Sequence, residues 1–238
     1  GKSWIGAYDL IRRAKPNRLY MVVAPTYIML ADSSLRSFLM HAENLGVLAK
    51  PFNRSAFNAT LRNGAEILFR SADNPDRLRG PNLTGIWMDE ASLQPEEVYN
   101  ILVGRLRQAG EVGWLSATFT PKGKVNWTYR VFGMGAPDTA IIHATTEDNP
   151  FLPERFEGTV RKQYTSTLAR QELGGEFMDA VGALFKREWF KNFVDADKVP
   201  IGVRRVRFWD KAATQDAGDW TVGLLMGCDD VTGLFYVT

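Results

Sequence analysis

The sequence predicts an α/β fold in which a parallel sheet carries helices on both faces. Apolar runs of strand length alternate with segments of helical spacing along the first 178 residues. These runs are nearly continuous instead of alternating between apolar and polar residues, which is typical of strands buried on both faces. Hydrophobic residues make up 45% of the 238 residues and charged residues 24%, which fits a globular protein with a sizeable core.

In chain order, the spacing first predicts a helix over 4–14 that is mostly buried and ends before Pro16. The predicted strands that follow cover residues 18–24, the hairpin 55–61 and 65–70, 83–90, 111–117 and 139–145. The further predicted helices cover residues 26–44, 95–108, 153–162 and 165–178. The composition then shifts near residues 182–203, which indicates a connection between domains. Strands over 204–209, 219–227 and 232–238 follow with short turns. Such a meander differs from the strand–helix alternation before it and predicts the start of a second domain.

The composition excludes several kinds of site. One cysteine, Cys228, and two histidines leave no disulfide framework within the chain and no cysteine- or histidine-rich zinc site. The net charge of +2 does not indicate nucleic-acid binding, so any DNA contact depends on local basic patches. No apolar stretch approaches the roughly 18 residues of a membrane span and no signal peptide opens the chain, so we expect an intracellular soluble protein.

The first three residues, Gly1, Lys2 and Ser3, run directly into a predicted helix. They match the end of the phosphate-binding pattern G-x-x-x-x-G-K-[ST], in which backbone N–H groups at a helix N-terminus face anionic oxygens. In such a loop Lys2 reaches the β- and γ-phosphates and Ser3 binds Mg²⁺. Because the chain does not begin with Met, we expect a piece cut from a longer protein.

The stretch TGIWMDEAS ends a predicted buried strand with two adjacent carboxylates, Asp89 and Glu90. Nucleotide hydrolysis needs an acid at a strand end to hold the magnesium shell, as Asp89 would, and a base for the attacking water, as Glu90 would. A divalent cation would also relieve the repulsion between the two charges. The alternative is a solvated strand end, where acids are common.

Two further segments belong to this hypothesis. SATFTP, residues 116–121, ends the next strand with small hydroxyl residues that would sense the γ-phosphate, or it is an ordinary Ser/Thr loop. Arg79, in the loop DRLRGPN, would stabilise the charge of the transition state. Arg105 and Arg107 are its rivals, and a solvated side chain is the alternative for each.

Taken in order, GKS, VVAPTY, DRLRGPNLTGIWMDEAS, SATFTPKGKVNWTYRVF and FWDKAATQDAGDWTVGLLMG resemble the large terminase subunit of tailed bacteriophages. The resemblance implies a RecA/ASCE-like P-loop packaging ATPase over residues 1–181, a linker over 182–203, and the first strands of an RNase H-like nuclease over 204–238. It implies ATP and Mg²⁺ as cofactors of the ATPase, and Mg²⁺ or Mn²⁺ as the cofactor of the nuclease.

The resemblance also implies roles for single residues. Gly1, Lys2 and Ser3 match the end of the Walker A motif, Asp89 and Glu90 the Walker B acid and catalytic glutamate, Thr118 the coupling residue, and Arg79 an arginine that acts on a neighbouring subunit. Asp210 matches the first metal-binding acid of the nuclease, with Asp219 assisting it and Asp216 a weaker candidate. From the residues alone, Asp210 is equally well a plain strand-end acid.

The implied partners are double-stranded viral DNA, the portal protein, the small terminase subunit and further copies of the chain in a ring on the procapsid. The implied location is the host cytoplasm, transiently at the procapsid portal. Basic residues that would grip DNA phosphates, or else are solvated surface charges, are Lys122, Lys124, Arg204, Arg205 and Arg207.

Two rival functions stay open. APTYIMLAD, DEAS and SAT are similar to segments of superfamily-2 helicases. The meander containing FWD favours the terminase, because a helicase would continue into a second RecA-like domain. A non-catalytic DNA-binding module is the other rival, and the presence of Lys2, Asp89 and Glu90 argues against it.

Overall fold

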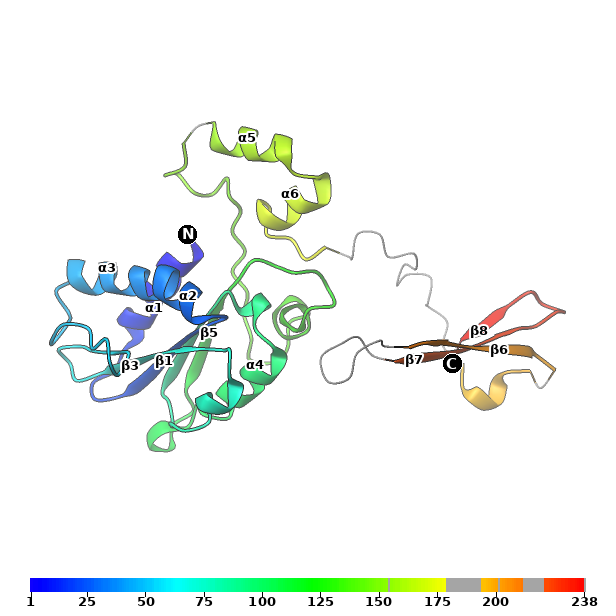
Figure 1. Ribbon diagram of the computed structural model, residues 1–238, viewed down its shortest axis with the longest axis horizontal. Helices are drawn as coiled ribbons and strands as arrows, with labels where there is room; N and C mark the ends of the chain where they lie inside the picture. Colours follow the sequence, from blue (N-terminus) through cyan, green and yellow to red (C-terminus); the bar gives the residue numbers. More distant parts are fainter. Residues whose placement is uncertain (154, 179–193, 201, 212–220, 238) are drawn as a thin grey trace. The chain divides into compact units, whose positions relative to one another are not determined.

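The computed structural model describes residues 1–153, 155–178, 194–200, 202–211 and 221–237. It divides into two compact units, residues 1–182 and 183–238 (Figure 1). The aromatic residues of the expected linker, Phe185, Trp189, Phe190 and Phe193, lie outside the described residues, as do Asp216 and Asp219.

The first unit is built on a five-stranded sheet in the order β2-β3-β1-β4-β5 (Figure 1). Four strands are parallel: β3 (Glu66–Ser71), β1 (Leu19–Ala24), β4 (Gly85–Asp89) and β5 (Trp114–Thr118). The short β2 (Asn58–Thr60) pairs antiparallel with β3 at one edge, across the predicted hairpin. The expected α/β class is therefore confirmed, with one antiparallel edge strand that the class alone does not require.

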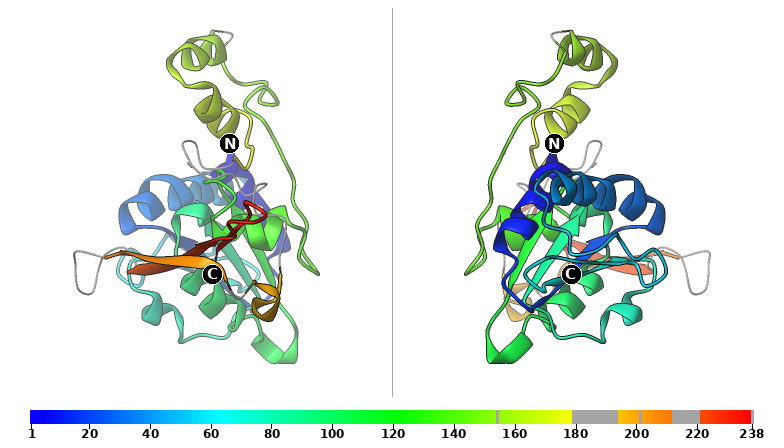
Figure 2. Two further views of the ribbon diagram at one scale, coloured as in Figure 1. Left: turned by 90° about the vertical axis from the view of Figure 1, so that its right-hand side faces the viewer. Right: turned by 90° about the vertical axis from the view of Figure 1, so that its left-hand side faces the viewer.

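Each face of the sheet has its own hydrophobic core, because alternate residues of a strand point to opposite faces. Tyr20 and Val22 of β1 pack in the core that includes buried residues of α1 (Lys2–Arg13) and α3 (Arg36–Asn44). Met21 and Val23 pack in the core that includes α4 (Glu96–Val103). Figure 2 shows helices on either side of the strands, as the sequence predicts.

Helix α1 is amphipathic instead of mostly buried. Gly6, Ala7, Leu10 and Ile11 face the core, whereas Trp4, Ile5 and Tyr8 are exposed. Gly6 packs so closely on Trp87 that a Cβ there would overlap the indole ring. The apolar positions of the expected helix thus cover more of its circumference than the sheet buries.

The segment predicted as one helix over 26–44 divides into three parts. Thr26 caps α2 (Tyr27–Met29) by accepting a bond from the Met29 N–H. A π-helical turn, η1 (Leu30–Leu35), comes next and leads directly into α3. Short 3-10 or π-helical turns also occur at η2 (Pro75–Leu78), η3 (Ala91–Leu93), η4 (Gln108–Gly110), η5 (Tyr129–Gly133) and η7 (Ala196–Lys198).

The predicted strand over 139–145 is wrong. No strand covers these residues, and Ile142 is 95% exposed. An apolar run becomes a strand only where a neighbouring strand offers backbone partners, and no sheet of the described residues includes this segment.

The remaining helices of the first unit are shorter than expected. Helix α4 ends at Val103 instead of residue 108, because Gly104 follows and the Arg105 carbonyl accepts a bond from the Leu83 N–H. The last two helices are α5 (Phe156–Gln163) and α6 (Ser166–Glu172). The chain leaves α6 through Gly174 and Gly175, and Gly175 has the positive φ of 64° that favours glycine after a helix.

The second unit contains a three-stranded antiparallel sheet in the order β6-β7-β8. Its strands are β6 (Arg204–Asp210), β7 (Val222–Cys228) and β8 (Phe235–Val237), so the expected meander is confirmed. Gly233, at φ 71°, lies in the turn between β7 and β8 and donates its N–H to the Asp229 carbonyl. Across the described residues of both units, every helix is too short or too polar to pass through a lipid bilayer.

Candidate active site at the end of strand β4

Residues far apart in the sequence converge at the carboxyl ends of β4 and β5. Parallel strands place their carboxyl ends at one edge of the sheet, and α1 begins above that edge. Ser3 Oγ lies 3.2 Å from Asp89 Oδ1 across 86 residues of chain, and Lys2 Nζ lies 3.7 Å from Glu90 Oε1. The structure thus brings together the lysine, the serine and the two acids that the sequence singles out.

Asp89 is a buried carboxylate held by three hydroxyl groups. The residue is 1% exposed. Oδ1 accepts bonds from Ser3 and from Thr118, the latter at 2.8 Å, and Oδ2 accepts a bond from Ser34 at 2.7 Å. A buried carboxylate is costly unless it is hydrogen-bonded, so these three donors offset the cost of burying Asp89 and hold it in place.

The direction of the Thr118 hydroxyl is set by its neighbour Trp87. The indole Nε1 of Trp87 lies 2.7 Å from Thr118 Oγ1. An indole N–H only donates, so Thr118 accepts from Trp87 and its own proton is directed to Asp89. Because Trp87 also packs on Gly6 of α1, the coupling candidate is connected both to the acid and to the helix that begins with Lys2.

Glu90 has a strained backbone and a shifted pKa. Its φ of 48° and ψ of 47° place it in the left-handed region, which costs a non-glycine residue about 1–3 kcal/mol. Burial raises the pKa of its carboxyl above the usual range, Asp89 and Glu172 raise it further, and Lys2 and the Thr120 N–H oppose the shift. A carboxylate with a raised pKa at a cavity is suited to accept a proton from water.

A cavity of about 260 Å³ opens beside the two acids. Its lining residues are Ala24, Pro25, Ile28, Met29, Asp32, Ser33, Ser34, Asp89 and Glu90. Ser33 Oγ lies 2.9 Å from Ser3 Oγ, so the π turn η1 contacts Ser3 through one serine and Asp89 through the next. Sequence analysis missed Ser33 and Ser34; their only signal is a pair of weak helix formers inside a helical pattern.

Gln94, a further residue that the sequence did not indicate, connects the ends of two strands. It is 2% exposed, and its Nε2 donates to the carbonyl of Asp89 at 2.8 Å and to the carbonyl of Val23 at 3.2 Å. Trp127 Nε1 in turn donates to the Gln94 carbonyl at 2.8 Å. These bonds fix the backbone where β4 leaves the sheet, immediately before Glu90.

Arg79 and its rivals lie elsewhere on the first unit. Arg79 makes ion pairs with Asp76 at 2.7 Å and Glu97 at 3.4 Å, and its side chain is 53% exposed. Arg105 donates to the Arg79 carbonyl, and Arg107 donates to Asn82. Within the described part of the chain, none of these arginines contacts Lys2, Ser3, Asp89, Glu90 or Thr118, so the structure does not bring them into the site.

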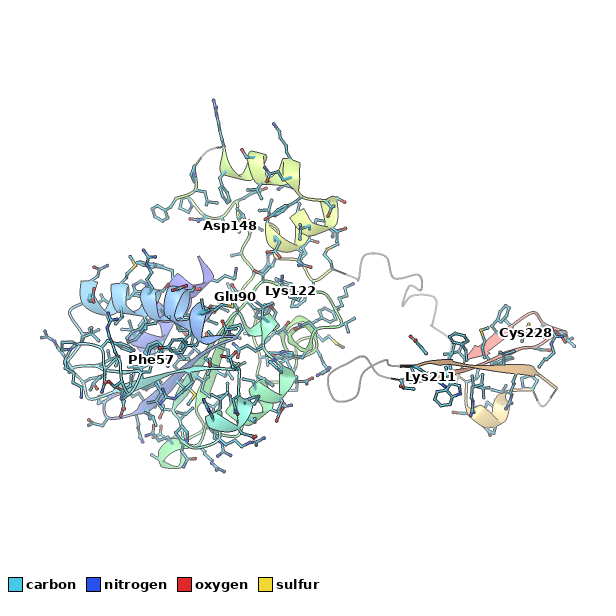
Figure 3. The ribbon with its side chains drawn as sticks, in the orientation of Figure 1. Phe57, Glu90, Lys122, Asp148, Lys211 and Cys228 are labelled. Carbon is cyan, nitrogen blue, oxygen red and sulfur yellow. The ribbon has the colours of Figure 1, made fainter. Side chains whose placement is uncertain are left out.

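The loop after β5 carries a basic residue that pairs with Glu172, a carboxylate whose charge also acts on Glu90. Figure 3 labels Glu90 and this residue, Lys122, on the first unit. Lys122 Nζ lies 3.2 Å from Glu172 Oε1 at the end of α6. Lys122 is therefore an exposed side chain that is held in an ion pair.

The donor set of the site fits Mg²⁺ held together with a nucleotide. Ser3 and Asp89 supply oxygen atoms, the donors that this hard cation takes. The residues that the structure describes include no group of three or more His, Cys, Asp or Glu side chains able to hold a metal ion alone. Magnesium beside a nucleotide needs no such cage, since it is bound through one or two carboxylates plus phosphates and water.

The candidate nuclease residues are only partly described. Asp210 is exposed at the end of β6, opposite Val222 in the antiparallel register. Asp219, its expected companion, lies outside the described residues. The nuclease metal site therefore stays a prediction.

Comparisons with known proteins agree in the family they indicate. A family model described as the N-terminal part of the terminase large subunit, T4likevirus-type, matches residues 1–192. The PBSX phage terminase large subunit of Bacillus subtilis (strain 168) is 28% identical over 201 residues, which covers 74% of this chain and 46% of that protein. The chain thus spans less than half the length of this relative.

Two solved structures are similar in fold. The large terminase ATPase domain of Thermus phage P74-26 has a TM-score of 0.54 at 28% identity, covering 72% of this chain and 80% of that one. The large terminase of a second thermophilic bacteriophage, in complex with ADP, has a TM-score of 0.65 at 17% identity, covering 98% of this chain and 59% of that one. The second likeness is one of fold alone.

Proposed function

Because the chain belongs to the family of T4likevirus-type terminase large subunits, we propose that it supplies the ATPase of a motor that moves double-stranded viral DNA into a procapsid. One observation carries the proposal: Ser3 and Asp89 meet at 3.2 Å beside the Lys2–Glu90 pair, across 86 residues of chain. The family membership replaces the helicase interpretation of the same motifs. An assembly module without catalysis would have no use for a strained, partly buried glutamate at the end of β4.

ATP is the proposed nucleotide. The terminase that was solved with ADP is similar in fold, which supports nucleotide binding by this chain. Helix α1 is 12 residues long, and its first N–H groups have no partner within the helix, so they favour phosphate oxygens. Lys2 Nζ, now paired with Glu90, would exchange that weak contact for the β- and γ-phosphates.

Ser3 and Asp89 would hold the magnesium ion that accompanies the nucleotide. The ion supplies charge neutralisation at the phosphates when it is bound. Asp89 keeps its orientation through Thr118 and Ser34 during this binding.

Glu90 is the proposed base for the attacking water. Its carboxylate lines the cavity, and its raised pKa brings its proton affinity closer to that of a working base. Thr118, bonded to both Trp87 and Asp89, is positioned to transmit the loss of the γ-phosphate into the sheet.

Arg79 is proposed to act on the nucleotide of a neighbouring subunit in a ring. Its half-exposed guanidinium and its ion pairs away from its own site support a role in trans. Arg105 and Arg107 are weaker candidates, because each donates to the segment 79–82. The DNA, the portal protein and the small subunit remain the proposed partners, with Lys122, Lys124, Arg204, Arg205 and Arg207 the proposed phosphate contacts, in the host cytoplasm and transiently at the portal.

The second unit is proposed to begin an RNase H-like nuclease, after a linker over 182–203. Asp210 and Asp219 would contribute to its Mg²⁺ or Mn²⁺ site. An antiparallel three-stranded meander that ends its first strand in an acid supports this proposal.

The test of the ATPase is magnesium-dependent phosphate release by the full-length protein and by Glu90→Gln. We expect the substitution to lower the turnover number by about 10²–10⁴-fold, the usual contribution of a general base, with ATP binding retained. Equal turnover in both proteins would remove Glu90 from the reaction.

A further inference from the structure

Two consecutive serines of the π turn η1 contact the two groups proposed to bind magnesium. Ser34 is fully buried and donates to Asp89 Oδ2 at 2.7 Å, and Ser33 donates to Ser3 Oγ at 2.9 Å. A π turn closes i→i+5 hydrogen bonds, so successive side chains are separated by a smaller angle than on an α-helix. Neighbouring residues of this turn therefore face the same site.

The two oxygens of the Asp89 carboxylate accept different numbers of hydrogen bonds from the described residues. A carboxylate accepts about four hydrogen bonds, and the described residues fill three of these positions on Asp89. Ser3 and Thr118 share Oδ1, whereas Ser34 is the one donor that the described residues place on Oδ2. Ser34 therefore holds Oδ2 in place, and the remaining acceptor position lies on this same oxygen.

We propose that Ser34 is a positioning residue for the nucleotide–magnesium site: it fixes Asp89 Oδ2, the oxygen whose remaining lone pair would be available to the hydrated metal ion. The inference rests on the proposed function, since it needs Asp89 to take part in magnesium binding. In this proposal Ser34 acts on the metal through Asp89, to which it donates its hydroxyl proton. Removing such an outer partner of a metal ligand typically weakens metal binding or activity 10- to 100-fold.

Thr84 provides a matched control next to the strand that carries Asp89. It precedes β4 at the opposite end from Asp89, is 7% exposed, and donates to Gln108 Oε1 at 2.7 Å. Thr84→Val and Ser34→Ala each remove one buried hydroxyl donor. Only the second removes it from the candidate active site.

The experiment measures binding of a fluorescent ADP analogue to the full-length protein, first in EDTA and then across a magnesium titration, without requiring turnover. For Ser34→Ala we expect unchanged affinity in EDTA and a half-saturating magnesium concentration raised about tenfold or more. For Thr84→Val we expect the wild-type magnesium dependence, even where both variants melt at a lower temperature than wild type.

Two results would overturn the role of Ser34 while leaving the ATPase intact. One is a wild-type magnesium dependence in Ser34→Ala, and the other is an equal shift in Thr84→Val, which would mean general destabilisation. Absence of any magnesium-dependent tightening in the wild-type protein would instead remove the proposed function and this inference with it.

Discussion

Strands β4 and β6 end in similar sequences and lie in opposite environments. Each strand contains tryptophan and ends in aspartate: GIWMD in β4 and RRVRFWD in β6. Every residue of β4 is buried, and every residue of β6 is exposed. β4 has parallel neighbours on both sides, whereas β6 pairs with β7 alone among the described residues. The local pattern predicts a strand that ends in an acid, but its neighbours determine whether that acid is buried.

The largest expected effect separates the two strand-end acids. Asp89→Asn replaces a carboxylate that accepts three hydroxyl bonds with a neutral amide, so we expect magnesium-dependent ATP hydrolysis to fall at least about 100-fold. Asp210→Asn changes an exposed residue of the other unit and should leave hydrolysis unchanged. A phosphate-release assay on the full-length protein compares them.

Cleavage of DNA by the same two variants should show the reverse pattern, because Asp210 is the proposed nuclease ligand. A loss of ATP hydrolysis in Asp210→Asn as large as that in Asp89→Asn would end the distinction between the two acids.

The two tryptophans should differ next most strongly. Trp87→Phe removes a buried indole that packs on Gly6 and donates to Thr118, so we expect a loss of about 2–3 kcal/mol in the free energy of unfolding. Trp209 is 52% exposed, and Trp209→Phe should cost less than about 1 kcal/mol. Urea denaturation of both variants measures the difference, and similar losses would contradict this prediction.

Glu90 should give a smaller, pH-dependent effect. Burial raises the pKa of its carboxyl above the ordinary 4.5. The contribution of such a carboxyl to the free energy of unfolding is fully present below its unfolded-state pKa and is lost as pH rises through its folded-state pKa. At neutral pH the ionised carboxylate therefore lowers the free energy of unfolding relative to a neutral side chain. Without nucleotide or metal, Glu90→Gln should therefore be more stable than wild type at neutral pH, by up to about 1 kcal/mol after discounting for partial exposure.

The gain in Glu90→Gln should disappear as pH falls below 4.5, where the wild-type carboxyl is itself neutral. Glu111 is the exposed control: Lys15 and Arg18 lower its pKa, so Glu111→Gln should not gain stability at neutral pH. Unfolding free energies measured between about pH 4 and pH 8 test both variants. A gain in Glu90→Gln that is independent of pH would contradict the assignment to charge burial.

The smallest expected effect concerns the half-exposed ion pair Lys122–Glu172. Solvent screens such pairs, so a double-mutant cycle of Lys122→Ala and Glu172→Ala should give a coupling of less than about 1 kcal/mol. A larger coupling in thermal denaturation would mean that this pair holds α6 against the loop after β5 more firmly than a surface contact does.

Much of the fold follows from the sequence, because apolar runs of strand length and helical spacing report burial directly. The strands that end at Ala24, Asp89 and Thr118 lie within one residue of their expected ends. The segment 139–145 shows the limit of this method, since an apolar run does not reveal whether a strand lies beside it. The end of α4 at Val103 was missed because spacing continues past the glycine that stops the helix.

The site was predictable where its chemistry is carried by charged motifs. Lys2, Asp89 and Glu90 stand out by residue type, and parallel strands bring their ends together. Ser33 and Ser34 could not be found in this way, because a π turn has no hydrophobic period of its own and serine is common on surfaces. Arg79 was identified by motif alone, and a role in trans depends on a neighbouring subunit that one chain does not contain.

A substitution at Gly6 would affect more of the molecule than helix α1. A methyl group at this position would collide with the Trp87 indole, so any larger residue must push the helix outward. Lys2 and Ser3 lie one turn earlier on that helix and would be displaced with it. In a saturation mutagenesis screen for packaging, position 6 should therefore tolerate as little as the phosphate-binding positions, and a smaller ring at position 87 should act as its suppressor.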